Sequence, residues 1–350
     1  MKKKLRIFSY ALTMVFLLVV SSCSNGKTET TSENVVTSST VESTTVSKGQ
    51  EGPVGKYTPD ELKGALIYII TDTQQNSYFV AEAEGAKAAA EAIGFQAKIT
   101  SYESDITKET ELCDMAIAEG AVAIIWDVTD SEASITSVQK AKDAGIPTFC
   151  TSRELNTTGV AVSQIVADNA GGSMAVAERF VQAVGEVGQY AELYGMEGDN
   201  NSKVRSESFH AVLDQYPDLE CVAVEVSNFS LPESYSDTEN ILQSHPDIIG
   251  IVTANDTMAL GAWQACVDAG KDDVVIIGVD GSDEVAASIK EGGILATALQ
   301  PCVLETRMAV QQAYDFLTKG TTGLPEKQIV ESPVIDSSNA DRLSGFYLST

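Results

Sequence analysis

The sequence GALIYII at residues 64–70 runs directly into TDTQQNSYF at residues 71–79. A short run of β-branched and aromatic residues after a glycine predicts a buried strand. The next residues include an acid and three amides, then the adjacent aromatics Tyr78 and Phe79, after which the sequence has a helical period. A polar loop with two aromatics therefore follows the carboxyl end of a buried strand, which is where open α/β sheets bind their ligands.

The same alternation of a short apolar strand and a longer helical segment occurs in two successive sets. The first set has the strands ALIYIIT, QAKITS, VAIIWDV and IPTFCTS, and the second set begins at VAVSQIVAD. Strands that alternate with helices form parallel sheets with helices on both faces. The sequence thus predicts an α/β protein with two doubly wound parallel-sheet lobes. Three further segments, ILATALQ, the long helix ETRMAVQQAYDFLTKG and a final extended run QIVESPVID, indicate that the chain crosses between the lobes more than once.

The first residues have the pattern of an export signal. Four basic residues among the first six precede an apolar run at residues 7–20, which is too short to span a membrane. VSSC at residues 20–23 resembles the bacterial lipobox, which implies a signal peptide of residues 1–22 and a lipid on Cys23. Ordinary cleavage with an unmodified Cys23 is the alternative. Residues 23–63 are rich in Ser and Thr and poor in large apolar residues, so we expect a disordered tether.

The net charge and the cysteines exclude several classes of partner. The formal charge of −27 at pH 7 repels nucleic acid and anionic lipid, so no nucleic-acid partner is expected. Five cysteines follow residue 23 without any CxxC spacing, and their apolar surroundings predict small buried hydrophobic residues. No metal site and no cofactor are therefore expected, and no GxGxxG dinucleotide motif occurs.

The residues that follow the predicted strands are acids, amides and aromatics. The two histidines, His210 and His245, do not end a strand. Carboxylates, amides and arginine can accept from or donate to several hydroxyls at once, and aromatic faces pack against the apolar faces of a sugar ring. The loop at residues 71–79 thus has the composition of a sugar-contacting loop. The alternative is that Tyr78 and Phe79 only pack on the sheet at the start of the first helix.

Seven motifs in order make the region from residue 64 to about residue 336 similar to the ribose-type periplasmic sugar-binding proteins, the substrate-capturing subunits of ABC importers. They are NSYF, the SR of TSREL, DNAGG, VRSESF, TANDTMALGA, IIGVDGSDE and ATALQP. The resemblance implies the type 1 periplasmic binding fold, with two lobes joined by a three-segment hinge and a sugar between them. It implies an N-terminal lobe of residues 64–166 plus 301–326 and a C-terminal lobe of residues 167–300 plus 327–350.

The resemblance also implies substrate-binding residues on both lobes. They are Asp72, Asn76, Tyr78, Phe79, Ser152 and Arg153 on the N-terminal lobe, Arg205, Phe229, Asn255 and Asp280 on the C-terminal lobe, and Gln300 near a hinge. The family usually has an aspartate directly before the arginine, where this chain has Ser152, and ribose binders have a small hydroxyl residue where this chain has Asp72. These departures leave the ligand open among pentoses, hexoses, sugar alcohols and related polyols.

This interpretation predicts an extracytoplasmic, lipid-anchored monomer that binds a small sugar or polyol and delivers it to a membrane permease. A sensory binding protein would use the same lobes and stays an alternative. A carbohydrate-active enzyme could use acids such as Asp72 and Asp280, but no nucleophile stands beside a base and no metal-ligand spacing occurs, so no enzyme is expected. A repressor of the lactose type would need a helix-turn-helix where the signal and the tether stand.

Overall fold

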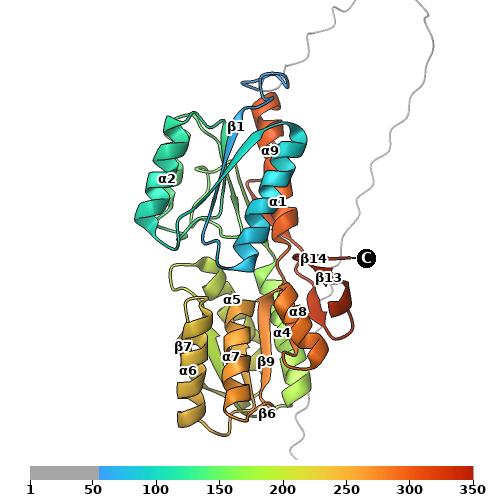
Figure 1. Ribbon diagram of the computed structural model, residues 1–350. Coiled ribbons are helices and arrows are strands. Elements are labelled where there is room, and N and C mark those ends of the chain that lie inside the picture. Colours follow the sequence, from blue (N-terminus) through green and yellow to red (C-terminus); the bar gives the residue numbers. More distant parts are fainter. Residues whose placement is uncertain (1–54, 350) are drawn as a thin grey trace, which may run out of the picture. The chain divides into compact units, whose positions relative to one another are not determined.

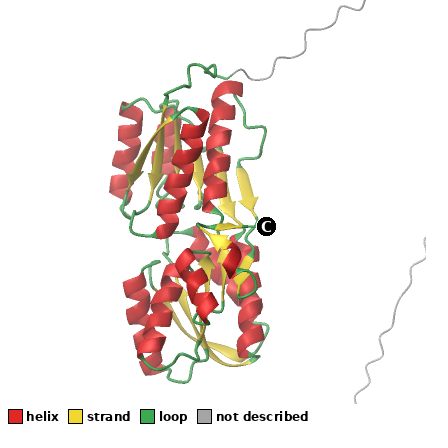
Figure 2. Cartoon of the chain, turned by 45° about the vertical axis from the view of Figure 1, so that its right-hand side comes forward, coloured by secondary structure: helices red, strands yellow, loops and turns green. Residues whose placement is uncertain are grey.

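The computed structural model describes residues 55–349, which form two α/β lobes (Figure 1). Each lobe has a six-stranded sheet with helices on both faces, and a third, two-stranded sheet lies near the C-terminus. Figure 2 shows the layered arrangement of helices and strands in each lobe. The predicted fold class of two doubly wound parallel-sheet lobes is therefore confirmed.

The first lobe contains an entirely parallel sheet in the order β11-β5-β4-β3-β1-β2. Helices α1 and α9 pack side by side on one face, and α2 and α3 pack together on the other. The strands are β1 Leu66–Thr71, β2 Gln96–Ser101, β3 Ala123–Trp126, β4 Thr148–Thr151, β5 Ser163–Ala167 and β11 Lys327–Val330. The helices are α1 Ser77–Ile93, α2 Ile106–Ala118, α3 Ile135–Asp143 and α9 Cys302–Lys319.

The second lobe repeats this design in the order β12-β10-β9-β8-β6-β7, with only β12 antiparallel to its neighbour. Helices α4 and α5 pack together, and α6 and α7 pack together. The strands are β6 Val187–Tyr194, β7 Asp218–Val226, β8 Gly250–Thr253, β9 Val275–Asp280, β10 Ala296–Leu299 and β12 Val334–Asp336. The helices are α4 Asn169–Val184, α5 Asn200–Leu213, α6 Leu231–Ser244, α7 Asp256–Asp268 and α8 Asp283–Glu291.

The chain crosses between the lobes three times, after β5, after β10 and after β11. The predicted extended run at residues 328–336 is in fact two strands in two different sheets. Lys327–Val330 pairs with β5 in the first sheet, whereas Val334–Asp336 pairs with β10 in the second. The expected assignment of residues 327–330 to the C-terminal lobe therefore needs correction, because the third crossing follows Val330.

The N-terminal boundary of the first lobe also differs from the expectation. The Tyr57 amide donates to the Leu317 carbonyl at 3.0 Å, and Leu62 is only 2% exposed. Residues 55–63 therefore pack on the first lobe and are not part of a disordered tether. The predicted signal peptide, Cys23 and the rest of the predicted tether lie outside the described residues. Within residues 55–349, no helix is both long and apolar enough to cross a membrane.

Apolar cores fill both faces of each sheet, and the cysteines contribute to them as predicted. Of the five free cysteines in the described part of the chain, four are buried and Cys221 is partly buried. Burial raises the pKa of the Cys150 thiol, the largest cause being desolvation. A thiol held protonated in this way is a poor nucleophile and metal ligand.

The polar residues after the strands form the N-caps of the following helices. A capping side chain accepts a hydrogen bond from a free backbone amide at the start of a helix. Seven helices have such a cap: Asn76 for α1, Asp105 for α2, Asp168 for α4, Asp199 for α5, Ser230 for α6, Asn255 for α7 and Ser282 for α8. Because parallel strands end at one edge of their sheet, most of these caps collect where the two lobes face each other.

Candidate functional site

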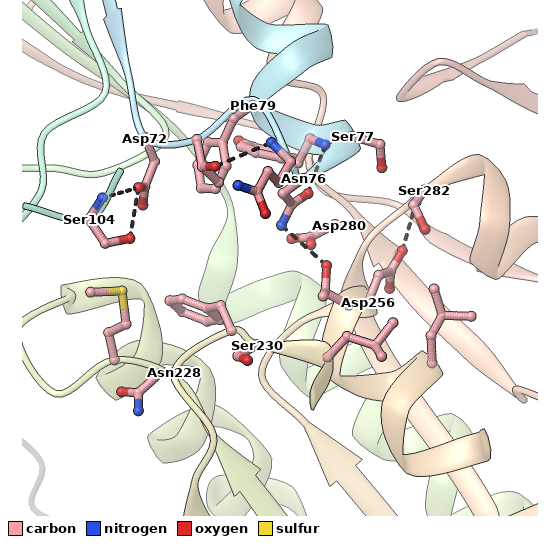
Figure 3. Close-up of a pocket in the computed structure, with 18 of the residues that line it drawn as sticks. Asp72, Asn76, Ser77, Phe79, Ser104, Asn228, Ser230, Asp256, Asp280 and Ser282 are labelled. Atoms are coloured by element: carbon pink, nitrogen blue, oxygen red, sulfur yellow. Dashed lines mark hydrogen bonds between the residues drawn. The ribbon is translucent and has the colours of Figure 1, made fainter. Parts of the chain in front are cut away.

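A polar cleft of about 550 Å³ lies between the lobes, at the carboxyl ends of the strands. Figure 3 shows that Asp72, Asn76, Phe79 and Ser104 of the first lobe face Asp280 and neighbouring residues of the second. A smaller cavity of about 20 Å³, the inner end, shares lining residues such as Tyr78, Arg153 and Asp280 with the cleft. A polar cleft at this edge of two α/β sheets is the expected place for a small ligand.

All eleven residues predicted to bind substrate lie in the wall of this cleft or at its inner end. They are Asp72, Asn76, Tyr78, Phe79, Ser152, Arg153, Arg205, Phe229, Asn255, Asp280 and Gln300. Their separation in the sequence exceeds 200 residues, and the fold brings them together. Their role in binding stays a prediction, because position alone does not measure affinity.

Arg153 lines both the cleft and its inner end and is 3% exposed. Its guanidinium donates to Asp199 at 2.6 Å, to the Tyr102 hydroxyl at 3.0 Å and to Asp127 at 3.3 Å. A longer contact of 3.4 Å joins it to Asp72. The guanidinium carbon also lies 5.3 Å from the centre of the Phe79 ring, which is a cation–π geometry. Arg153 thus holds together an aromatic, a phenol and three carboxylates.

Asp72 is oriented by the loop after β2. Its Oδ1 accepts from both the amide and the hydroxyl of Ser104, each at 2.8 Å (Figure 3). Its Oδ2 lies 3.4 Å from Arg153. These bonds satisfy a carboxylate that is only 2% exposed. The predicted acid at this wall is therefore present and held in one orientation.

Asp199 is an acid at the inner end that the sequence analysis missed. It caps α5 on the second lobe, yet its Oδ2 accepts from Arg153 of the first lobe. The family's aspartate before the arginine is Ser152 in this chain, and Asp199 supplies a carboxylate to Arg153 from the second lobe. The signal available in the sequence was its place at the start of a helix, in GDNNS, after a strand.

The second lobe supplies a second arginine with its own partners. Arg205, 2% exposed, donates through Nε to the Asn169 side chain at 2.8 Å and through NH1 to the Ala254 carbonyl at 2.7 Å. Its NH1 lies 3.8 Å from Asp280, which also accepts from Gln300 at 2.5 Å. Burial raises the pKa of Asp280 to about 7, although the nearby Arg205 lowers it. This acid and this arginine offer an acceptor and a donor on one wall.

Tyr78 and Phe79 pack with the apolar core of the second lobe, and not with the cores of the first sheet as the alternative interpretation expected. Tyr78 and Phe79 are 4% and 7% exposed and belong to an apolar core, yet both also line the cleft. Their rings pack edge to face with 5.4 Å between centroids. Phe229 faces the cleft from the second lobe. Aromatic surfaces on both sides suit a ligand with an apolar face.

Direct hydrogen bonds join the lobes around the cleft. Asn76 Nδ2 donates to the Thr257 hydroxyl of the second lobe at 3.2 Å (Figure 3). The Ser77 hydroxyl contacts Glu284 at 3.4 Å. At the inner end, Asn201 Nδ2 donates to the Ser152 carbonyl at 3.0 Å. With the Arg153–Asp199 ion pair, these contacts hold the two walls against each other. The structure therefore represents a conformation in which the lobes touch.

Backbone strain in the described residues is concentrated at the cleft. Seven residues other than glycine have a positive φ, a conformation that L-residues with side chains rarely adopt. Every one of them lines the cleft or its inner end: Glu103, Ser104, Ser152, Asn228, Phe229, Asp280 and Phe346. Such strain persists only where the surroundings hold it in place, and it is typical of ligand-binding sites.

Two buried polar atoms at the inner end have no partner in the described part of the chain. They are the Tyr78 hydroxyl and Gln300 Oε1. Buried polar atoms are nearly always hydrogen-bonded, so an unpaired one in a cleft indicates a place for a ligand hydroxyl or a water. No cluster of His, Cys, Asp and Glu in residues 55–349 has the arrangement of a metal site.

Two acids behind the cleft are unusual because they are fully buried in the first lobe. Glu82 accepts from Thr151 at 2.8 Å and from Thr71 at 3.3 Å, and Glu305 accepts from the Ser152 amide at 3.3 Å. Burial raises the pKa of Glu305 to about 8 and that of Glu82 to about 7. Through these hydrogen bonds, Glu82 joins the ends of β1 and β4, and Glu305 holds the backbone at Ser152, beside the predicted binding residue Arg153.

We predict that Glu305→Gln reduces the loss of stability at alkaline pH. The pKa of Glu305 in the folded protein lies above its ordinary value of 4.5. Its contribution to the free energy of unfolding is therefore fully present below pH 4.5 and is lost as pH rises through about 8. In the wild type, the free energy of unfolding should fall across this range, and the variant should fall less, by roughly 2–4 kcal/mol. Urea unfolding at pH 5 and pH 9 measures it. Parallel pH profiles would contradict the prediction, and the exposed Glu291→Gln is the control.

The two lobes, the three crossings and the cleft together define a two-lobed binding protein for small molecules. Residues 67–322 match the periplasmic binding protein domain family. A D-apiose import binding protein of Actinobacillus succinogenes is 47% identical over 81% of this chain and 92% of its own length. A ribose import binding protein of Bacillus subtilis is 32% identical over 73% of this chain and 82% of its own length.

Solved structures agree with this result. A periplasmic solute-binding protein of Actinobacillus succinogenes with bound D-allose is 27% identical to this chain, with a TM-score of 0.74. The match covers 79% of this chain and 99% of that protein's chain. The chain belongs to the periplasmic binding protein family, and within it to the ribose type, as the sequence motifs predicted.

Proposed function

We propose that this chain, the substrate-binding protein of an ABC sugar importer, captures D-apiose or a monosaccharide of similar size. The observation that carries the proposal is the identity of 47% and 46% to two D-apiose import binding proteins, each of which is aligned over more than nine-tenths of its length. The identity to ribose binders is lower, at 32% or less. The more distant solved relatives hold other small polyols, such as D-allose and glycerol.

The chemistry of the cleft agrees with a small, hydroxyl-rich ligand. Asp72 and Asp280 are acceptors on opposite walls, and Arg153 and Arg205 are donors beside them. Charged groups with a fixed orientation bind a ligand most tightly when its hydroxyls lie at matching positions, since charge-assisted hydrogen bonds contribute about 1.5–3 kcal/mol each.

Binding would work by closure of the two lobes around the sugar. The ligand favours the closed conformation because only there do both walls contact it. The three crossings are the segments about which the lobes would move. A micromolar dissociation constant corresponds to about −8 kcal/mol, which several such hydrogen bonds less the cost of ordering can supply.

Calorimetry with D-apiose, D-ribose, D-allose, xylitol and glycerol tests the choice of sugar. We expect D-apiose to bind most tightly and to raise the melting temperature by a few degrees at 100 times its dissociation constant, where binding adds about 2.7 kcal/mol. Tighter binding of another of these compounds would change the proposed ligand but would leave the proposed function as a sugar-binding protein in place. The absence of binding to any of them, in folded protein, would overturn both.

The remaining expectations belong to the same proposal. Lipid attachment at Cys23 rests on the VSSC motif after the apolar run, and it predicts a diacylglyceryl modification that mass spectrometry of membrane-extracted protein would detect. We also propose that the protein is a monomer, delivers its sugar to a membrane permease, and catalyses no reaction. The binding proteins among its relatives support the last two points.

A further inference from the structure

A C-terminal hairpin forms part of the junction between the lobes. The segment after β12 contains the 3₁₀ helix Ala340–Arg342 and strands β13 Leu343–Ser344 and β14 Tyr347–Leu348. It packs against α8 of the second lobe, and the Gly345 amide donates to Asp283 at 2.9 Å. Figure 1 shows β13 and β14 at the level where the two lobes meet. The hairpin is therefore attached to the second lobe beside the cleft.

Phe346 at the tip of this hairpin reaches the wall of the opposite lobe. A residue in a two-residue turn is usually exposed, but Phe346 is only 3% exposed, whereas the next residue, Tyr347, is 59% exposed. The Phe346 ring packs edge to face on Tyr78 of α1, with 5.4 Å between centroids and planes at 88°. Phe346 also lines the cleft. One ring from the end of the chain thus contacts a predicted sugar-binding residue of the first lobe.

The backbone at Phe346 is strained, and the strain indicates that its side chain matters. Gly345 and Phe346 have φ of 57° and 58°, which is the requirement of a tight hairpin turn with two positive φ values. Gly or Asn adopts this conformation readily, whereas a bulky residue does so at a cost. A phenylalanine here is stabilised by what its ring contacts. Every other residue with a positive φ in the described part of the chain, glycines apart, also lines the cleft or its inner end.

We propose that Phe346 is a positioning residue for sugar binding, which it serves by holding the Tyr78 ring in place across the junction of the lobes. The inference rests on the proposed sugar-binding function. The Tyr78 ring also packs edge to face on Phe79, which itself contacts Arg153. Loss of Phe346 would free Tyr78 on one side and remove an apolar contact that exists only when the lobes touch. The bound sugar would then dissociate faster.

A double-mutant cycle between Phe346 and Tyr78 tests the proposal. We expect Phe346→Ala to weaken sugar binding about tenfold, mostly through a faster off-rate, and the matched control Tyr347→Ala to change it less than twofold. In a Tyr78→Ala background, Phe346→Ala should add less than a twofold effect. If Phe346 acts on stability alone and not through Tyr78, the losses of affinity in the two single variants should multiply in the double variant. That outcome, or an unchanged affinity of Phe346→Ala, would overturn the proposal.

The same variants separate this proposal from the choice of sugar. If the wild type binds no sugar, the proposed function fails, and small-angle scattering then tests the junction by itself. Phe346→Ala should have a larger radius of gyration than the wild type and Tyr347→Ala, because the lobes lose a contact that joins them. Equal radii would reject the role of Phe346. If Phe346→Ala does not fold, Phe346→Leu keeps an apolar side chain but removes the ring edge and serves in its place.

Discussion

Replacing Arg153 with alanine should abolish measurable sugar binding and also lower the free energy of unfolding by about 3–5 kcal/mol. Arg153 is buried among Asp72, Asp127 and Asp199, and its loss leaves three buried carboxylates without their counter-charge. The sequence predicts Arg153 only as a substrate-binding residue of the N-terminal lobe. The structure adds the second effect, because the same guanidinium joins acids of both lobes.

Two variants separate the two effects of Arg153. Arg153→Lys keeps the charge but loses the planar fork, so we expect intermediate stability and binding that is still weakened at least tenfold. Arg179→Ala removes an arginine that is about half exposed, and should change neither property. Urea unfolding and calorimetry measure both quantities. Wild-type stability and affinity in Arg153→Ala would reject the central position that we give to this residue.

The sequence predicted much of the fold because its pattern is strong at every level. Buried parallel strands such as β1 and β3 are continuous apolar runs, and polar caps such as Asn76 and Asn255 mark the starts of the helices between them. The interruption after β11 has a signal in the sequence, because the ESP of residues 331–333 breaks the apolar pattern of QIVESPVID and a proline argues against one continuous strand. What the sequence does not show is the sheet to which each half belongs. Only the pairing partners, β5 for one half and β10 for the other, divide it between sheets.

The candidate site was predictable in part for a topological reason. In parallel sheets, the residues that follow the strands share one edge, so residues such as Asp72 and Asp280 could be grouped without coordinates. Asp199 and Phe346 were missed for different reasons. Asp199 stands in a loop whose direction the sequence does not specify, and Phe346 follows no strand of either large sheet. Contacts between the lobes depend on how the lobes pack, which no local pattern encodes.

The residues with a positive φ also show that tertiary contacts at the cleft can outweigh the conformational preference of a residue. Local preference would place Gly or Asn at a position such as Phe229, which has a φ of 57°. Where the chain instead places an aromatic or an acid, tertiary contacts at the cleft outweigh the local preference. A mismatch between residue type and backbone conformation is thus a marker of the site that becomes visible only in the structure.

Asp280→Asn is expected to weaken sugar binding about 100-fold while leaving the fold intact at pH 8. A carboxylate accepts from Gln300 and from ligand hydroxyls at once, whereas an amide has a single acceptor oxygen and adds a donor toward Arg205. Loss of a charge-assisted hydrogen bond and the mispaired donor together account for about 3 kcal/mol. Asp272→Asn, an exposed aspartate before β9, makes the same charge change and should bind normally.

The pH dependence of this site gives a second, independent test. Burial raises the pKa of Asp280 from 3.8 to about 7, so its contribution to stability is present below pH 3.8 and is lost as pH rises through about 7. The affinity for sugar should instead increase with pH, because ligand hydroxyls that donate to Asp280 favour its ionised form. The affinity of the wild type should therefore increase between pH 5.5 and pH 8, and that of Asp280→Asn should stay nearly constant. Equal slopes in calorimetric titrations at the two pH values would show that Asp280 does not accept from the sugar as a carboxylate.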